Sequence, residues 1–380
     1  MRDRIIIALE SALAAGNIPG AVAMVGNRAG IIAEAAIGQK SPGGAAMPIN
    51  AQFQIASMTK AITSVAAMQL VERGKLDLDG PLGALLPDLA QVQVLTGFAE
   101  DGKPLYRAPK QAVTLRHLLT HTSGLGYEFM AAELVRYRAA VPAVPFSRAA
   151  LVTPLLADPG AAWLYGTSTD WVGLAVEAAS GQSLASWFND HITGPLGMAD
   201  TGFFSPQAVG DRLVPLHVRS PEGALMPLPI SFNGGEYDSG GGGLTSTAQD
   251  YLRFARMLLN GGSLDGEQIL RPETVADMTR NQIGDLRAGV LETTVPGMSS
   301  TMTWFPEMTA KWGLGFLINP ETTSDGRTAG SCAWAGIANS YYWLDPAGDI
   351  AGVLMMQFMP FGDPAALAAL AAFERAVYAD

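Results

Sequence analysis

Residues 54–60 read QIASMTK and place Ser57 three positions before Lys60, at the start of an apolar helical pattern that predicts a helix from Gln54 to Arg73. Positions i and i+3 lie on the same face of a helix, so the Lys60 amine can reach the Ser57 hydroxyl. Backbone N–H groups at a helix N-terminus also point toward an anion that forms beside the serine. The pair is therefore either a nucleophile with its own base, or a helix cap followed by a solvated lysine.

The usual alternative serine motif is absent. No serine in the chain has glycine at both −2 and +2, as a G-x-S-x-G nucleophile would require. His121, Thr122 and Ser123 follow one another in the sequence, but His and Ser side chains so close along the chain cannot generally adopt the hydrogen-bonded arrangement of a catalytic triad. His117 and His121 have the i, i+4 spacing of a zinc helix, yet no glutamate follows His117. Two structural histidines are the preferred interpretation, and we expect no metal and no other cofactor.

Composition excludes several classes of protein. The 380 residues are 48% hydrophobic and 16% charged, which is typical of a globular enzyme. Net charge is −11 without any dense basic run, so a nucleic-acid partner is not expected. No apolar run approaches the length of a membrane span, and Cys332 is the single cysteine, so no internal disulfide can form. We expect a cytoplasmic protein with no membrane partner; the sequence does not indicate its oligomeric state.

Strand-like segments occur near both ends of the chain. After an amphipathic first helix, residues 21–26 and 30–38 predict a β-hairpin. Strand-like sequence returns after residue 310, in the segments 311–318, 339–344 and 350–358, and a helix over 364–378 follows.

The middle of the chain is predominantly helical. Predicted helices cover residues 114–121, 128–139, 147–156, 168–180 and 183–191. A glycine-rich stretch, 234–243, then precedes a helix over 247–259. Glycines 240–243 are expected to permit close backbone approach and not to bind phosphate, since no Lys-Ser/Thr follows them. We therefore predict an α/β (α+β) fold in which residues 1–79 and 234–380 form a discontinuous domain with an antiparallel sheet flanked by helices, and residues 80–233 form a mostly helical domain.

Four further segments carry a family resemblance. They are LRHLLTHTSGL (115–125), YGTSTDWVGLAVEAASG (165–181), GGGGLTSTAQDYLRF (240–254) and SCAWAGIANSYYWLDPAGDIAGVLMMQ (331–357). With Ser57-x-x-Lys60, this ordered set resembles the serine β-lactamase and penicillin-binding-protein superfamily, and within it the family VIII carboxylesterases, which are related to class C β-lactamases. The resemblance spans residues 20–358 and implies a β-lactamase/transpeptidase-like fold.

The resemblance implies roles for particular residues. Ser57 would be the acylated nucleophile, Lys60 its proton partner and Tyr165 the catalytic tyrosine. The family pattern at that tyrosine is Tyr-x-Asn, and this chain has Tyr165-Gly166-Thr167. Thr167 lacks the side-chain amide with which the Asn of β-lactamases makes a contact. A serine needs a base to become nucleophilic, and sequence cannot divide that work between Lys60 and Tyr165.

A second motif bears on substrate binding. Trp334-Ala335-Gly336 stands where β-lactamases have Lys-Thr-Gly, and Trp-x-Gly is typical of the esterase branch. The resemblance implies that the N–H groups of Ser57 and Ile337 form the oxyanion hole. Tyr127 follows TSGLG and is a candidate for lining the acyl pocket, although it could equally be an ordinary loop tyrosine.

The expected reaction is hydrolysis of a small-molecule, short-chain carboxylic ester through an acyl-enzyme on Ser57. Alternatives within the superfamily are a β-lactamase, a D-amino-acid peptidase and an acyltransferase that passes the acyl group to another alcohol. The alternative that is not an enzyme is a penicillin-binding sensor, which would be acylated on its serine and would not release the acyl group.

Overall fold

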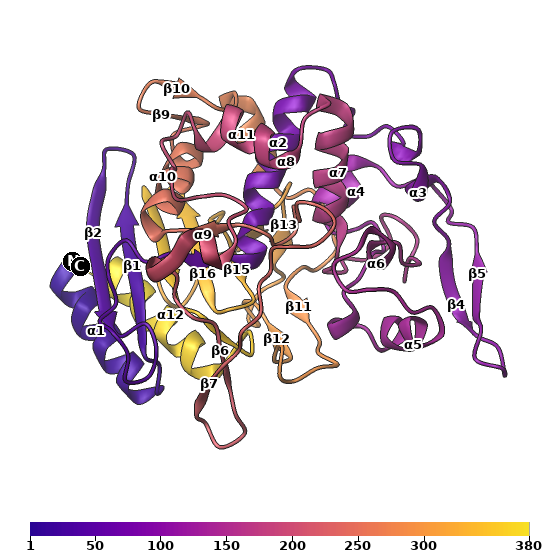
Figure 1. Cartoon of the computed structure of the whole chain (residues 1–380). Helices are drawn as coiled ribbons and strands as arrows, with labels where there is room; N and C mark the ends of the chain where they lie inside the picture. The colour runs from indigo at the N-terminus through magenta and orange to yellow at the C-terminus, as the bar shows by residue number, and fades with distance from the viewer. Residues whose placement is uncertain (380) are drawn as a thin grey trace.

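The computed structural model describes residues 1–379 and contains an antiparallel seven-stranded sheet, whose strands β1, β2, β15 and β16 lie in the left half of Figure 1. Its strand order is β13-β14-β15-β16-β17-β1-β2, so the N-terminal hairpin lies beside a C-terminal strand. Val22 of β1 pairs with Met355 of β17. The strands are β1 (Gly20–Gly26), β2 (Ile31–Gly38), β13 (Lys311–Trp312), β14 (Leu317–Ile318), β15 (Cys332–Gly336), β16 (Ser340–Asp345) and β17 (Ile350–Met355).

Helices cover both faces of this sheet. Trp343 of β16 packs on Phe373 of α12 (Pro364–Tyr378), with ring centroids 5.2 Å apart. Its neighbour Tyr342 packs on Tyr251 of α10 (Ala248–Leu259) at 5.0 Å. Successive side chains of a strand point to opposite faces, so α12 and α10 lie on opposite sides of the sheet. Helix α1 (Arg2–Ala15) packs beside α12. The predicted antiparallel sheet flanked by helices is confirmed.

Helix α2 (Thr59–Glu72) runs through the centre of the molecule, and nearly all its residues are buried. Its buried polar side chains form internal hydrogen bonds, as Ser64 does to the Lys60 carbonyl and Thr63 to the Gly240 carbonyl. We expected this helix to begin at Gln54, and that was wrong. Strand β3 (Phe53–Gln54) pairs instead with β8 (Thr245–Ser246), and a 3₁₀ turn, η1 (Ala56–Met58), precedes α2.

Glycines interrupt one predicted strand. Residues 311–318 form a hairpin of β13 and β14, not one strand, because the chain turns between Trp312 and Leu317. Gly315 has φ +106°, and a Cβ there would collide with the Ser64 hydroxyl of α2. The next strand, β15, was not predicted separately, and the prediction for 350–358 divides into β17 and the short β18 (Phe358–Met359).

The middle of the chain is helical, but several helices are shorter than predicted. Helix α6 ends at Leu151 because the chain then becomes extended: the N–H of Leu155 donates to Gln93 and its carbonyl accepts from Leu95. The hairpin of β4 (Val94–Phe98) and β5 (Pro104–Arg107) was not predicted. The helical elements are η2 (Leu82–Ala84), α3 (Pro87–Ala90), α4 (Leu115–Leu119), η3 (Glu128–Met130), α5 (Ala132–Ala140), α6 (Arg148–Leu151), α7 (Ser168–Ser180), α8 (Leu184–Phe188), a π-helical turn η4 (Asn189–Thr193), α9 (Pro206–Val209) and η5 (Gly210–Arg212).

Short elements complete the fold. They are β6 (His217–Arg219), β7 (Leu225–Pro227), β9 (Ser263–Leu264), β10 (Glu267–Gln268), α11 (Pro272–Met278), β11 (Val290–Leu291) and β12 (Met302–Thr303). Across residues 1–379, no helix is both long enough and apolar enough to span a bilayer. The proposed domain boundaries, after residues 79 and 233, stay a prediction.

Candidate active site

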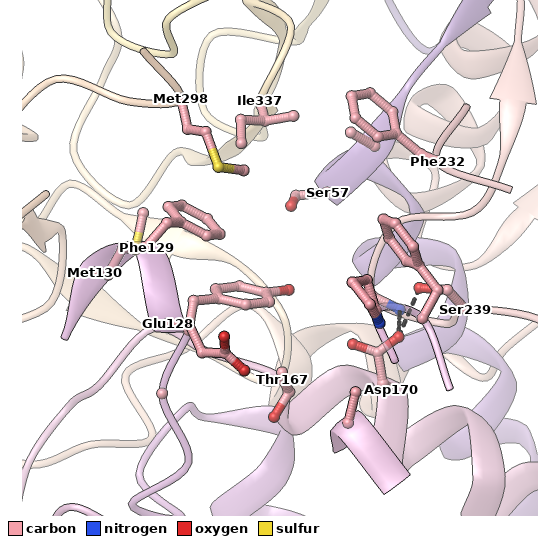
Figure 2. A pocket seen from close by; sticks show the side chains of 18 of the residues that line it. Ser57, Glu128, Phe129, Met130, Thr167, Asp170, Phe232, Ser239, Met298 and Ile337 are labelled. Atoms are coloured by element: carbon pink, nitrogen blue, oxygen red, sulfur yellow. Dashed lines mark hydrogen bonds between the residues drawn. The ribbon is translucent and has the colours of Figure 1, made fainter. Parts of the chain in front are cut away.

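A cavity of 770 Å³ opens beside Ser57, and its walls are mainly apolar. Figure 2 shows Ser57 facing Phe129, Met298 and Ile337 across this space. Apolar side chains come from segments far apart in the sequence: Phe129, Met130, Val135, Phe146, Leu151, Ile230, Phe232, Val295, Met298, Trp334, Ile337 and Phe361. A concave apolar site with few polar groups is the usual form of a small-molecule site.

Ser57 lies in the 3₁₀ turn η1, immediately before α2. The preceding residue, Ala56, has φ +44°, a left-handed conformation that is unfavourable for a residue with a Cβ. Tertiary contacts hold this turn: the N–H of Ile55 donates to Leu244, and the hydroxyl of Tyr251 donates to the carbonyl of Met58. These contacts hold the strained backbone of Ala56 in place, and the turn thereby fixes the direction in which Ser57 points.

Lys60 is 1% exposed and lies in the first turn of α2. Its Nζ lies 3.1 Å from Ser57 Oγ, 2.9 Å from the phenol oxygen of Tyr127 and 2.6 Å from the carbonyl oxygen of Gly241. An ammonium has three N–H donors, so these oxygens satisfy all three. A neutral amine could keep the Gly241 bond and accept a proton from Ser57. The contact predicted from the i, i+3 spacing is therefore present, and the lysine is not solvated.

Two tyrosines flank Lys60 in different ways. The amine bonds to Tyr127, which sequence analysis had assigned only to the pocket wall. Tyr165 instead accepts a hydrogen bond from the indole N–H of Trp334 at 2.9 Å, and its ring centroid lies 5.0 Å from Lys60 Nζ. The two phenol rings are 5.4 Å apart. Burial raises the pKa of Tyr127 well above its usual value, and Tyr165 and Asp170 add to this effect, so Tyr127 is an uncharged phenol at neutral pH.

The end of β15 lies directly against the turn that carries Ser57. A Cβ on Gly336 would collide with the carbonyl oxygen of Ile55, so only glycine permits this approach. The cavity is lined by both Ser57 and Ile337, with Trp334 and Ala335 beside them. This arrangement brings together the two residues whose N–H groups were predicted to form an oxyanion hole.

The glycine run allows the chain to pass between two helices. A Cβ on Gly240 would come within 2.9 Å of the Thr169 carbonyl of α7 and 3.0 Å of the Thr63 side chain of α2. Thr63 also donates to the Gly240 carbonyl at 2.7 Å. The expected close backbone approach is thus present at Gly240. A further residue that was not predicted from the sequence is Asp170, a buried carboxylate in the first turn of α7 that also lines the cavity.

The two spaced histidines occupy structural positions. The Thr114 N–H donates to Nδ1 of His117 as part of the N-terminal capping of α4. His121 is 1% exposed and lies among the rings of Trp163, Tyr165 and Trp312. Burial lowers the pKa of His121 well below its usual value, so the ring is neutral. Within residues 1–379, no group of three or more His, Cys, Asp or Glu side chains is placed to hold a metal ion.

The cavity wall contains one cationic side chain, and it is already paired. Arg138 Nε lies 2.7 Å from the Glu128 carboxylate, and its other nitrogens bond to backbone carbonyls of Val141 and Ala150. Within the described chain, no other lysine, arginine or histidine lines this cavity. A substrate carboxylate would therefore meet no free positive charge among the lining residues.

The fold and a serine–lysine pair at the start of a buried helix define the serine enzymes of the β-lactamase and penicillin-binding-protein kind. A family model described as Beta-lactamase matches residues 6–376, and the chain belongs to this family. The superfamily indicated by the sequence motifs is thereby confirmed.

Relatives within the family include enzymes of two kinds. Acyltransferase calJ of Penicillium decumbens is 33% identical over 85% of this chain and 79% of its own length. Lovastatin esterase of Penicillium rubens is also 33% identical, over 84% of this chain and 82% of its own. Among solved structures, a mutant of simvastatin synthase from Aspergillus terreus has a TM-score of 0.84 and 31% identity, covering 99% of this chain and 96% of that one.

Proposed function

We propose that this protein is a serine acyl-transfer enzyme that takes the acyl group of an uncharged ester onto Ser57. The observation that carries the proposal is the contact between Lys60 Nζ and Ser57 Oγ at the wall of a large apolar cavity. A serine hydroxyl becomes an effective nucleophile only when a neighbouring base takes its proton. Lys60 and the tyrosines beside it are the groups able to do so here.

In the acylation step, the proton of Ser57 passes to the unit formed by Lys60 and Tyr165, and Oγ attacks the ester carbonyl carbon. The resulting oxyanion would be held by the N–H groups of Ser57 and Ile337, a type of contact typically worth about 10²–10³ in rate. The C–O bond of the ester then breaks, and the leaving alkoxide takes the proton. Tyr127 fixes the position of the Lys60 amine throughout.

The second step decides between hydrolysis and transfer. Water or an alcohol gives its proton to the same unit and attacks the acyl carbonyl, and Ser57 leaves with a proton. The apolar cavity, at 770 Å³, is large enough for both an acyl chain and a hydrophobic alcohol. Relatives named as acyltransferases support transfer to an alcohol, and the relative named as an esterase supports hydrolysis. We propose that both occur, with alcohols competing against water.

The substrate class follows from the charge of the site. Burying a carboxylate without a partner is costly, and the one cation lining the cavity within residues 1–379, Arg138, is paired with Glu128. This supports neutral esters and argues against carboxylate-bearing β-lactams and D-amino-acid peptides. We also propose that the chain belongs to the esterase branch of the superfamily, because it has Trp334-Ala335-Gly336 where β-lactamases have Lys-Thr-Gly.

Nitrophenyl butyrate tests the proposal directly. We expect nitrophenol release and a protein mass increased by one butyryl group, mapped to the peptide that contains Ser57. Addition of a hydrophobic alcohol should produce its butyrate ester while butyric acid formation declines. Turnover with no butyryl-protein on Ser57, even on rapid quenching, would argue against this mechanism; acid as the sole product at every alcohol concentration would exclude transfer.

A further inference from the structure

Asp170 is a buried carboxylate with no cationic partner in direct contact. It is 5% exposed, and within residues 1–379 no Lys, Arg or His nitrogen lies within 4.0 Å of its oxygens. One oxygen, Oδ1, accepts from the Ser239 hydroxyl at 2.6 Å and from the Gly241 N–H at 3.1 Å. Figure 2 shows both bonds reaching the same oxygen while the other oxygen turns toward the cavity. Burying a charge without a charged partner is unfavourable, so the presence of this carboxylate in the wall of the cavity that Ser57 also lines requires a reason.

Gly241 connects this carboxylate to the lysine. Its N–H donates to Asp170, and its carbonyl oxygen accepts from Lys60 Nζ at 2.6 Å. A single residue, Gly241, therefore links the two side chains through the peptide groups on either side of its Cα. A Cβ on Gly241 would collide with the Asp170 carboxyl group, so the contact requires glycine at this position. Asp170 and Lys60 thus bond to opposite sides of the same glycine.

Asp170 also interacts electrostatically with Lys60 and with two nearby tyrosines. Burial raises the pKa of Asp170, and the charge of Lys60 opposes that rise. Asp170 in turn helps to raise the pKa of Tyr127 and of Tyr237. The titratable groups around this carboxylate, including those that line the same cavity, are Lys60, Tyr127, Tyr165, Tyr237, and Glu128 with its partner Arg138.

We propose that Asp170 is a positioning residue for proton transfer: through Gly241 it orients Lys60, and its negative charge stabilises the ammonium that forms when Ser57 gives up its proton. The proposal rests on the acyl-transfer function inferred above. An ammonium inside the protein is stabilised by a nearby carboxylate because the surrounding dielectric constant is low. Asp170 touches neither Ser57 nor a reacting atom, and it acts through Lys60.

Asp170→Asn tests the charge while keeping the shape and an acceptor oxygen. Removal of the negative charge favours the proton-free form of a neighbouring base, so the acidic limb of kcat/KM for nitrophenyl butyrate should move to lower pH by about one pH unit. We expect kcat to fall by about 10–100-fold, a loss within the range of general acid–base effects, while KM changes little. If the asparagine variant is insoluble, Asp170→Ser removes the same charge and should move the limb in the same direction.

Asp250→Asn is the matched control. Asp250 is likewise buried in the first turn of a helix, α10, and accepts from the Asp200 N–H at 2.8 Å and the Thr201 hydroxyl at 3.0 Å. It does not line the cavity. This variant should lose stability and keep the wild-type pH profile. A folded Asp170 variant with an unmoved acidic limb would overturn the inference, whereas a wild-type protein that is never acylated on Ser57 would overturn the proposed function itself.

Discussion

The indole N–H of Trp334 donates to the phenol oxygen of Tyr165 at 2.9 Å. The two rings meet nearly edge to face, with centroids 4.9 Å apart. Both residues come from segments that resemble the superfamily, but the residue on β15 is an indole where β-lactamases have the lysine of Lys-Thr-Gly. An uncharged donor thus orients the tyrosine in this protein. Within residues 1–379, Lys60 is the lysine whose side-chain nitrogen contacts Ser57.

Ser57→Ala should abolish turnover of nitrophenyl butyrate and leave the fold intact. The N-cap of α2 is Met58, and no side chain caps this helix. Ser57 therefore makes no capping bond, but its hydroxyl accepts a hydrogen bond from the buried Lys60 amine. Loss of that acceptor should lower the free energy of unfolding by about 1–3 kcal/mol. Thermal unfolding and a butyrylation assay check both statements. A folded alanine variant with near wild-type turnover would identify another nucleophile.

Lys60→Ala and Tyr165→Phe should each lose activity, and the double variant should lose little more than either. Both groups are proposed to act as one proton-transfer unit, and such units are strongly non-additive when removed. Each single change is expected to cost about 10²–10⁴ in kcat, as for other general acid–base groups. Should the two losses multiply, the residues act independently and the coupled mechanism is wrong.

Tyr127→Phe should lower activity less than Lys60→Ala or Tyr165→Phe does. The change removes one of the three acceptors of Lys60 Nζ but keeps the aromatic wall of the cavity. A hydrogen bond to a charged group is worth about 1.5–3 kcal/mol, so a loss of at least about tenfold in kcat/KM is expected. A loss as complete as that of Tyr165→Phe would instead make Tyr127 the principal tyrosine of the proton-transfer unit.

Local sequence predicted some helices to the residue. Helix α12 starts with Pro364 after an aspartate cap, and α7 ends before Gly181, whose φ of +74° is left-handed. Capping and turn residues of this kind are local signals. The start of α2 could not be predicted in this way, because strand β3 forms only by pairing with β8, far along the chain.

The contacts of the candidate site also fall into two groups, those that local sequence predicts and those that only the folded chain creates. The contact between Ser57 and Lys60 is a consequence of helix spacing, so it could be predicted from seven residues of sequence. The bond from Lys60 to Tyr127 joins residues 67 positions apart, and the link through Gly241 spans 181 positions. Packing creates these contacts, and no local pattern encodes them. Asp170 was missed for this reason, although it lies within a segment that carries the family resemblance.

Gly336→Ala should reduce activity by moving Ile337 away from Ser57. The added Cβ would meet the carbonyl oxygen of Ile55, and either β15 or the η1 turn must shift. Loss of one oxyanion donor typically costs about 10²–10³ in kcat, and overpacking should lower stability by about 1–3 kcal/mol. Gly30→Ala is the control, since its Cβ would meet nothing within 4 Å. Unchanged kcat in a folded Gly336→Ala protein would exclude the assigned oxyanion hole.

The last prediction concerns selectivity between neutral esters and β-lactams. We expect kcat/KM for nitrophenyl butyrate to exceed that for nitrocefin, because Trp334 offers an N–H and apolar surface where a lysine would offer a charge for the lactam carboxylate. That N–H is already engaged with Tyr165, and the cavity's Arg138 is paired with Glu128. Trp334→Lys should shift the ratio toward nitrocefin, although loss of the bond to Tyr165 should also lower both rates. Trp334→Phe separates the two effects, since it removes the bond without adding a charge and should leave the ratio near that of the wild type. A wild-type ratio at or below one would overturn the assignment to neutral esters.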